Sequence, residues 1–254
     1  MSIEQAIDAF WDCACRHTAP PPQWMNRLSR EDAYRVQLGV LARHVQAGER
    51  QAGWKVGLTS KAMQIQQKVH EPVLGFLLAS GEKPSGTRFP FADLINPGFE
   101  NELCLTVGRT LRGPGVSDAQ AQAALSAMAP AFEIIEKRGD FSADLNVSLA
   151  DNAQQRAYVT GAPVPVPPGF DLATVTLELG VNGAVAERAA GAEVLGTPAA
   201  SVAWLANKLA ELGLALEAGM KVMSGSFTRQ YPLSRGDRIE ASFVPVGPVR
   251  AEFV

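Results

Sequence analysis

Apolar residues recur at helical spacing in two segments of the first half of the chain. Ser29 followed by Asp32 is typical of a capped helix start, and the apolar positions that continue this helix are Tyr34, Leu38, Leu41, Ala42 and Val45. A second helix is predicted from residue 117 to about residue 129, where Pro130 ends it. The first of these segments is expected to form an amphipathic helix.

The best-marked helix lies in the second half of the chain. Thr197 is a typical N-cap, Pro198 occupies the first turn, and Gly213 stands just past the expected end. Proline is tolerated in the first turn because its missing N–H has no partner there in any case. We therefore predict a helix that starts after Thr197 and ends before Gly213.

Shorter runs rich in Val, Ile and Thr indicate strands between and after these helices. Eight are predicted, over residues 102–107, 131–136, 156–160, 174–181, 184–188, 220–224, 238–244 and 249–253. Asn182-Gly183 between two of them is typical of a type I′ hairpin. Helices gather in the first half and strands in the second, which favours an α+β fold with a β-rich core.

Composition and charge restrict the class of protein. The 254 residues are 46% hydrophobic and 19% charged, with a formal net charge of −3. Lys and Arg form no cluster, so neither nucleic acid nor an anionic membrane is an expected partner. No run reaches the ~18 apolar residues of a membrane span. An N-terminus without the pattern of a signal peptide and an odd number of cysteines favour a reducing cytoplasm.

Cys13, Cys15 and His17 stand close together near the N-terminus. A metal cluster is one interpretation, but a fourth ligand and the usual zinc spacing are missing. All three residues also fit a first helix. We favour the helix, with free thiols.

Two glutamates share one face of a predicted strand in ENELCLTVG. Side chains alternate along a strand, so Glu100 and Glu102 point the same way. A solvated face is one explanation. A third acid, Glu133, interrupts the apolar run of PAFEIIEKR, where a carboxylate is costly to bury without a compensating charge. Three converging carboxylates would suit a hard cation such as Mg²⁺ or Mn²⁺.

A lysine lies between apolar neighbours in GWKVGLTSKAM. If this segment is a strand that leads into a helix, Lys55 points inward and the hydroxyls of Thr59 and Ser60 lie at a helix N-terminus, where an anion is favoured. The alternative is a lysine that reaches the surface. A buried Lys55 beside a metal-bound carbonyl would have the lowered pKa that proton transfer at neutral pH requires.

Together these segments resemble the 2-keto-4-pentenoate hydratase and 4-oxalocrotonate decarboxylase branch of the fumarylacetoacetate hydrolase superfamily. The resemblance covers almost the whole chain, through LSREDAYRVQ, GWKVGLTSKAMQ, HEPVLGFL, ENELCLTVGRTL, PAFEIIEKR, DNAQQRAYVTG, LGTPAASVAWLANKLAELG and VMSGSFT with SRGD. It implies a mixed β-roll or sandwich-like core with a small N-terminal helical part. Residues 1–70 would form the helical region with the lysine-bearing strand, and residues 71–254 the catalytic core, in one integrated domain.

The resemblance also implies a homo-oligomer that depends on Mg²⁺ or Mn²⁺. The family's metal-binding acids fall on Glu100, Glu102 and Glu133. By the same correspondence the catalytic residues are Lys55, Ser60 and Ser226, and the candidate substrate-binding residues are Thr59, Asp151, Thr228, Arg229, His70 and Glu71. Asn152 belongs to the same family motif as Asp151, but Gln154 and Gln155 stand where the family has small residues.

Two of these assignments have alternatives. His70-Glu71 corresponds to a segment that activates water in hydrolase branches of the superfamily, and a surface-loop histidine is the reading that we favour. Arg229 could hold a second substrate carboxylate by a bidentate pair, or it could be an exposed loop arginine, which we also favour.

The expected activity is metal-dependent hydration of a 2-hydroxy-2,4-dienoate to a 4-hydroxy-2-oxo acid, in the catabolism of aromatic ring-cleavage products. Decarboxylation of a 2-oxo-3-enedioate is the main alternative. Cleavage of an acylpyruvate C–C bond and a non-catalytic partner subunit that only binds metal and ligand are weaker alternatives. A complex with a pathway partner enzyme is also open. A serine hydrolase is disfavoured because the chain lacks a G-x-S-x-G motif and its only histidines are His17, His44 and His70.

Overall fold

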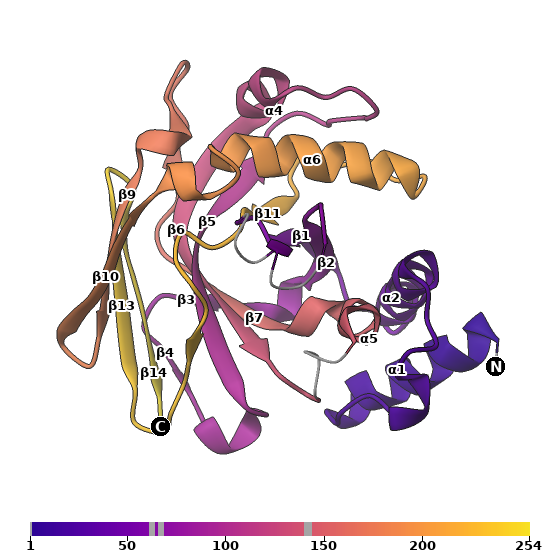
Figure 1. Cartoon of the computed structure of the whole chain (residues 1–254). Helices are drawn as coiled ribbons and strands as arrows, with labels where there is room; N and C mark the ends of the chain where they lie inside the picture. Colours follow the sequence, from indigo (N-terminus) through magenta and orange to yellow (C-terminus); the bar gives the residue numbers. More distant parts are fainter. Residues whose placement is uncertain (1, 61–63, 66–68, 140–143) are drawn as a thin grey trace.

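The computed structural model describes residues 2–60, 64–65, 69–139 and 144–254. Two sheets form the centre of the molecule, with α1, α2 and α5 beside one sheet and α6 across its upper end (Figure 1). The larger, curved sheet has nine strands and its main path runs β2-β1-β11-β5-β6-β7-β3. The smaller sheet has five strands in the order β10-β9-β13-β14-β4. The predicted α+β class with a mixed β core and a small helical N-terminal part is confirmed.

Two helices at the N-terminus pack against each other. Helix α1 (Ile3–Arg16) begins with a reciprocal capping box between Ser2 and Gln5. Helix α2 (Arg30–Gln46) begins at the predicted cap, where the hydroxyl of Ser29 accepts from the backbone N–H of Asp32. The predicted apolar stripe of α2 is shifted, because the helix packs against both α1 and α5 (Leu145–Ala150). Its buried residues are Ala33, Tyr34, Val36, Gln37, Val40 and Leu41, whereas Ala42 and Val45 are exposed.

The nine-stranded sheet contains four of the eight predicted strands, namely 102–107, 131–136, 156–160 and 220–224. Their bounds are β1 (Gln51–Gly57), β2 (Val73–Leu78), β3 (Glu82–Pro84), β5 (Pro97–Val107), β6 (Leu125–Glu136), β7 (Gln155–Thr160), β8 (Val164–Pro165), β11 (Lys221–Met223) and β12 (Tyr231–Pro232). Strand β1 lies inside this sheet, between β2 and β11. The lysine-bearing strand is therefore integral to the core, which supports the proposal of one domain.

The prediction of a helix over residues 117–129 is wrong in its second half. Helix α4 (Asp118–Ala124) begins at Ser117 and stops after two turns. Strand β6 then starts at Leu125 and pairs with β5 along its whole length, with Met128 opposite Leu105. Pairing with an eleven-residue strand outweighs the helical preference of this alanine-rich segment.

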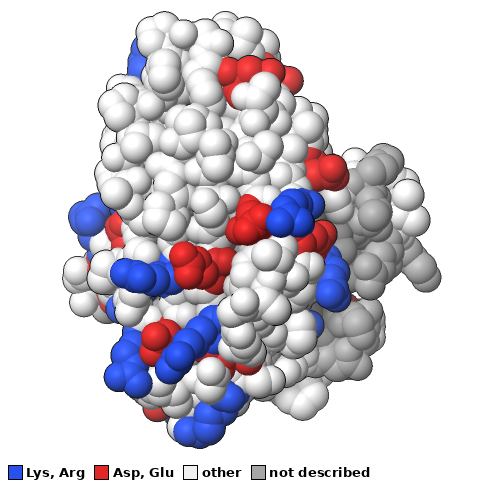
Figure 2. All heavy atoms as spheres, turned by 90° about the vertical axis from the view of Figure 1, so that its left-hand side faces the viewer, with Lys and Arg blue, Asp and Glu red and all other residues white. Residues whose placement is uncertain are grey.

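The five-stranded sheet contains β4 (Thr87–Phe89), β9 (Thr176–Val181), β10 (Ala184–Ala190), β13 (Arg238–Val244) and β14 (Gly247–Phe253). The predicted Asn182-Gly183 hairpin joins β9 to β10, and both turn residues have positive φ. Figure 2 shows Lys and Arg next to Asp and Glu over the lower part of the face in view. In this sheet Arg188 of β10 pairs with Glu178 of β9. Positive and negative side chains are thus mixed on this face.

The remaining long helix is α6 (Pro198–Glu211), which starts after the predicted cap Thr197. It lies across the upper end of the curved sheet in Figure 1 and packs against α4. Eight of its residues are buried, among them Val202, Leu205 and Leu209. No helix of the described residues has the length and apolar character that crossing a membrane requires.

Candidate functional site

Three glutamates converge on the inner face of the curved sheet. Glu100 on β5 lies directly opposite Glu133 on β6, and Glu102 follows two residues along β5. One carboxylate oxygen from each lies within 4.8 Å of the others. Glu102 and Glu133 have no exposed surface, and Glu100 is half-buried. The solvated-face explanation of the two strand glutamates is therefore excluded.

The buried carboxylates lack the partners that burial normally requires. Glu102 Oε2 accepts a 2.8 Å hydrogen bond from the backbone N–H of Gly225. Among the described residues, neither Glu102 Oε1 nor either oxygen of Glu133 has a partner in hydrogen-bonding geometry. Buried polar atoms without partners are rare and costly. An oxygen-only set with this much charge fits a divalent cation such as Mg²⁺ or Mn²⁺.

Lys55 is the cation that faces this cluster. It is buried on β1, and its Nζ lies 3.3 Å from Glu133 Oε1, which is ion-pair distance. The surface alternative for this lysine is thus wrong. Burial lowers the pKa of Lys55, but the charges of Glu133, Glu100 and Glu102 outweigh it, so the pKa is raised and not lowered. A bound divalent cation would offset these charges and so lower the pKa of Lys55, which is the predicted direction.

Glu102 and Glu133 hold protons more tightly than ordinary glutamates do. Burial, reinforced by the other two carboxylates, raises the pKa of Glu102 well above its ordinary value. Burial likewise raises the pKa of Glu133 to about 7, against the lowering effect of Lys55. Because crowded carboxylates resist ionisation, a proton or a metal ion among them is favoured.

The raised pKa of Glu133 predicts how pH affects the protein. Between the ordinary value of 4.5 and about 7, the folded state keeps a proton that the unfolded chain releases. In a chelator, stability should therefore fall as the pH rises through this window. Mg²⁺ affinity should instead rise, because the cation displaces that proton. Thermal unfolding in EDTA and calorimetric Mg²⁺ titration across this window test both trends, and a pH-independent Mg²⁺ affinity would contradict them.

Hydroxyl groups of the predicted substrate-binding segments surround β5 near the carboxylates. Ser226 Oγ accepts from the backbone N–H of Asn101 at 3.3 Å, and Thr228 Oγ1 accepts from Asn101 Nδ2 at 2.7 Å. Thr59 is buried against Gly225, where a Cβ would lie only 2.4 Å from Thr59 Cγ2. The structure thus brings Thr59 to Gly225, whose N–H binds Glu102, and Ser226 to the backbone of β5. The side chain of Asn101, and Thr228 with it, lies on the face of β5 opposite Glu100 and Glu102. Sequence reasoning had not identified Asn101 and Gly225.

The segment after Lys55 is described only in part. Ser60 is half-buried, and its backbone oxygen accepts from the N–H of Gln64. Gln64 and Ile65 are helical, but most of the predicted helix N-terminus falls on residues 61–63 and 66–68, outside the described residues. The role of Ser60 stays a prediction.

Three of the predicted substrate-binding residues, His70, Glu71 and Arg229, each have separate surroundings. His70 is exposed, and the carboxylate of Glu71 pairs with Lys208 of α6 at 3.3 Å. Arg229 is exposed, with its guanidinium 4.4 Å from the centre of the Tyr231 ring. These contacts agree with the surface interpretations, and the substrate roles of the three residues stay predictions.

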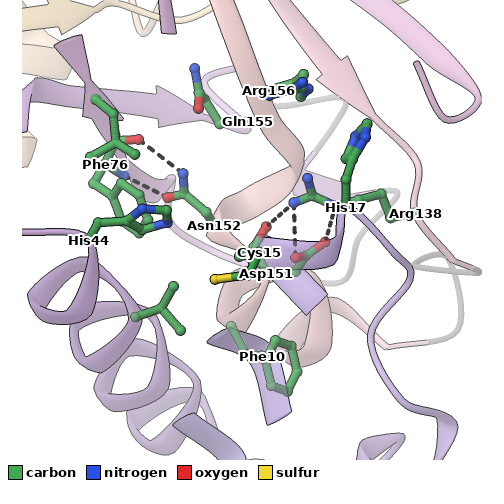
Figure 3. A pocket seen from close by; sticks show the side chains of 14 residues that line it. Phe10, Cys15, His17, His44, Phe76, Arg138, Asp151, Asn152, Gln155 and Arg156 are labelled. Carbon is green, nitrogen blue, oxygen red and sulfur yellow. Dashed lines mark hydrogen bonds and ion pairs between the residues drawn. The ribbon is translucent and has the colours of Figure 1, made fainter. Parts of the chain in front are cut away.

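Asp151 lies in a buried charge network beside a cavity of about 300 Å³ (Figure 3). Its two carboxylate oxygens accept from Arg138 at 2.9 and 3.0 Å. Arg138 also pairs with Glu136, which His17 Nε2 contacts at 2.7 Å. Through these contacts the end of α1 is linked to β6. They do not involve a substrate, so a direct substrate contact of Asp151 stays a prediction.

His17 is therefore a structural link. It follows α1 as the C-cap, in a left-handed conformation. Cys13 is buried and Cys15 exposed, and both are free thiols. The preferred interpretation of this segment as part of a first helix is confirmed for Cys13 and Cys15.

Comparison with known proteins identifies the family. Residues 42–254 match the model for the fumarylacetoacetate (FAA) hydrolase C-terminal family. The chain belongs to this family. It is 35% identical to 2-hydroxyhexa-2,4-dienoate hydratase of Comamonas testosteroni over 94% of this chain and 92% of the relative. It is 38% identical to 4-oxalocrotonate decarboxylase of Pseudomonas sp. (strain CF600), over 88% and 85% of the two chains.

A solved structure extends the likeness to the whole fold. The 4-oxalocrotonate decarboxylase from Pseudomonas putida G7, complexed with magnesium and adipate, superposes with a TM-score of 0.94 at 32% identity. The match covers 100% of this chain and 99% of that chain. The family resemblance drawn from the sequence is thereby confirmed.

Proposed function

We propose that this member of the FAA hydrolase family is a metal-dependent lyase that adds water to a 2-hydroxy-2,4-dienoate. The product is a 4-hydroxy-2-oxo acid. The observation that carries the proposal is the convergence of half-buried Glu100 with buried Glu102 and Glu133, and Lys55 at 3.3 Å from Glu133. The named hydratases among the relatives, including 2-hydroxypent-2,4-dienoate hydratase of Pseudomonas putida, support the substrate class.

Glu100, Glu102 and Glu133 would hold the divalent cation, and Mg²⁺ or Mn²⁺ fits their oxygen-only chemistry. When bound, such a cation supplies Lewis-acid stabilisation of enolate charge. The magnesium in the structure of the P. putida G7 decarboxylase supports a divalent ion here.

Lys55 is the proton-transfer residue in this proposal. It would carry the proton of the substrate's C2 hydroxyl to C5, which turns the dienol into an α,β-unsaturated ketone that accepts water at C4. Addition of water at C4 leaves an enolate, and Lys55 would return a proton to its C3, which completes the 4-hydroxy-2-oxo acid. Burial keeps bulk water from the Lys55 ammonium group and would hold this group near the reacting enol. Ser60, Ser226 and Thr228 would orient the substrate carboxylate and C2 oxygen by hydrogen bonds.

Decarboxylation of a 2-oxo-3-enedioate is the second candidate. The 38% identity to a named decarboxylase and the TM-score of 0.94 to another favour it specifically. Both reactions use an enolate at C2, and they differ in whether water is gained or CO₂ is lost. Acylpyruvate cleavage is less well supported, because Glu71 pairs with Lys208 and His70 is exposed. A non-catalytic subunit would not need the complete set of three carboxylates and Lys55.

Direct assay separates the two main candidates. The purified protein with Mg²⁺ is incubated with enzymatically generated 2-hydroxypenta-2,4-dienoate and, separately, with 2-oxohex-3-enedioate, while ultraviolet absorbance and CO₂ are followed. The proposal predicts consumption of the dienoate without CO₂. Faster loss of the enedioate with stoichiometric CO₂ would make decarboxylation the function.

Substrate length can be tested at Arg229. If its guanidinium turns from Tyr231 to hold a second carboxylate, Arg229→Leu should raise KM for six- and seven-carbon dioates by roughly tenfold or more and leave KM for the five-carbon monoacid unchanged. Steady-state kinetics on both substrate types provide the measurement. Equal effects on both, or none, would restrict Arg229 to the surface and favour a short monocarboxylic dienoate.

The proposal also includes that the protein forms a homo-oligomer in the cytoplasm, with or without a pathway partner enzyme. Light scattering coupled to size-exclusion chromatography measures the assembly state directly.

A further inference from the structure

The side chain of Asn152 closes the curved sheet next to Lys55. Strand β2 is the last strand on its side of the sheet path, so one of its backbone edges has no strand neighbour on that path. Asn152, in the short helical turn η4 (Asn152–Gln154), occupies this edge. Its Oδ1 accepts from the N–H of Phe76 at 2.7 Å, and its Nδ2 donates to the carbonyl of Phe76 at 3.0 Å (Figure 3). One amide thus replaces a neighbouring strand.

The same residue lies against the backbone that supports Lys55. Gly75 precedes the clamped Phe76 and is the register partner of Lys55. A Cβ on Gly75 would lie 2.9 Å from both the backbone oxygen and Oδ1 of Asn152, and 3.2 Å from Lys55 Cε. Gly75 is therefore packed between Asn152 and the Lys55 side chain, and the space at Gly75 has no room for a methyl group.

We propose that Asn152 is a positioning residue for Lys55 and acts through Gly75 and the edge of β2. The inference rests on the proposed role of Lys55 in proton transfer. A lysine side chain has four rotatable bonds, and its direction is set by the surfaces that confine it. Release of β2 from Asn152 would widen the space at Gly75 and let the ammonium leave its place beside Glu133. Displacements of about 1 Å in a reacting group can cost 10²-fold in rate.

The chain contains a matched control for this clamp. Asn207 on α6 makes the same two hydrogen bonds with a single residue: its Oδ1 accepts from the N–H of Val116 at 2.9 Å, and its Nδ2 donates to the carbonyl of Val116 at 2.9 Å. Val116 lies in the connection between β5 and α4 and is not a neighbour of Lys55 in the sheet. Asn207→Ala therefore removes an equivalent amide clamp elsewhere.

The test measures proton transfer without hydration or decarboxylation. 2-Oxopentanoate has no double bond to hydrate, but its C3 hydrogens exchange with D₂O through the enol, and proton NMR follows this exchange in the presence of Mg²⁺. Asn152→Ala should slow exchange by roughly 10- to 100-fold, whereas Asn207→Ala should leave it within about twofold of the wild type. Melting temperature and Mg²⁺ affinity are measured for each variant.

A second readout does not depend on activity. NMR of isotope-labelled lysine side chains in the magnesium-free protein should show a Lys55 ammonium signal that is protected from water in the wild type and in Asn207→Ala, and unprotected in Asn152→Ala. Asn152→Asp, which keeps the size and the acceptor but loses the donor to Phe76, should lie between the two and serves if Asn152→Ala does not fold.

The outcomes separate the inference from the proposed function. Equal exchange rates and equal protection of Lys55 in Asn152→Ala and Asn207→Ala would overturn the positioning role and leave the proposed function standing. Absence of exchange in the wild type, with Mg²⁺ bound, would overturn proton transfer by Lys55 itself. In that case a change in Lys55 protection confined to the Asn152 variants would still support the structural coupling.

Discussion

Glu102→Gln is expected to abolish magnesium-dependent turnover while the fold stays intact. The substitution keeps the size of a fully buried side chain and an acceptor for the Gly225 N–H, but it removes one of three ligand charges. Removing a residue that only orients a metal ligand typically lowers metal affinity or activity by 10- to 100-fold. Removing the charge of a ligand itself should therefore lower them by more than roughly 100-fold. Turnover with Mg²⁺, calorimetric Mg²⁺ affinity and melting temperature in EDTA measure the effect.

The control for this variant is Glu82→Gln. Glu82 lies on the same sheet but pairs with Lys221 and accepts from Thr160, outside the three-carboxylate cluster. Its substitution should leave Mg²⁺ affinity unchanged. Ordinary Mg²⁺ affinity and turnover in Glu102→Gln would show that the cluster is not the metal site.

Lys55→Met is expected to slow turnover by roughly 10²-fold or more with little change in metal affinity. Methionine keeps most of the apolar stem but carries no proton, and removal of the cation leaves the carboxylates of Glu100, Glu102 and Glu133 in place. Steady-state kinetics and Mg²⁺ titration distinguish this effect from loss of the metal.

Lys221→Met is the corresponding control, because Lys221 stands on the neighbouring strand β11, opposite Gly53, and pairs with Glu82. Near-normal turnover in Lys55→Met, or an equal loss in the two variants, would rule out proton transfer by Lys55.

The convergence of the carboxylates could be predicted because strand alternation is a short-range rule. Two residues of separation place Glu100 and Glu102 on one face in any strand, and the apolar run around Glu133 indicated burial. The β5–β6 register then adds what the sequence could not specify, namely that Glu133 lies opposite Glu100. Local turn chemistry was equally informative at Asn182-Gly183.

Features that depend on long-range pairing could not be predicted in this way. The segment after Ala124 has the composition of a helix, and only its pairing with β5 makes it a strand. The clamp of Asn152 on Phe76 joins residues 76 positions apart, and the contact of His17 with Glu136 spans 119 positions. The direction of the Lys55 pKa shift also depends on neighbours from two other strands, so burial alone indicated the wrong sign.

The product formed from 2-hydroxypenta-2,4-dienoate tests the central claim most directly. Mass spectrometry of a reaction with purified protein and Mg²⁺ should show 4-hydroxy-2-oxopentanoate, which is the substrate plus one water, and EDTA should prevent its formation. Unchanged substrate in the presence of bound Mg²⁺, or a product that has not gained water, would contradict the assignment of this protein as a metal-dependent hydratase.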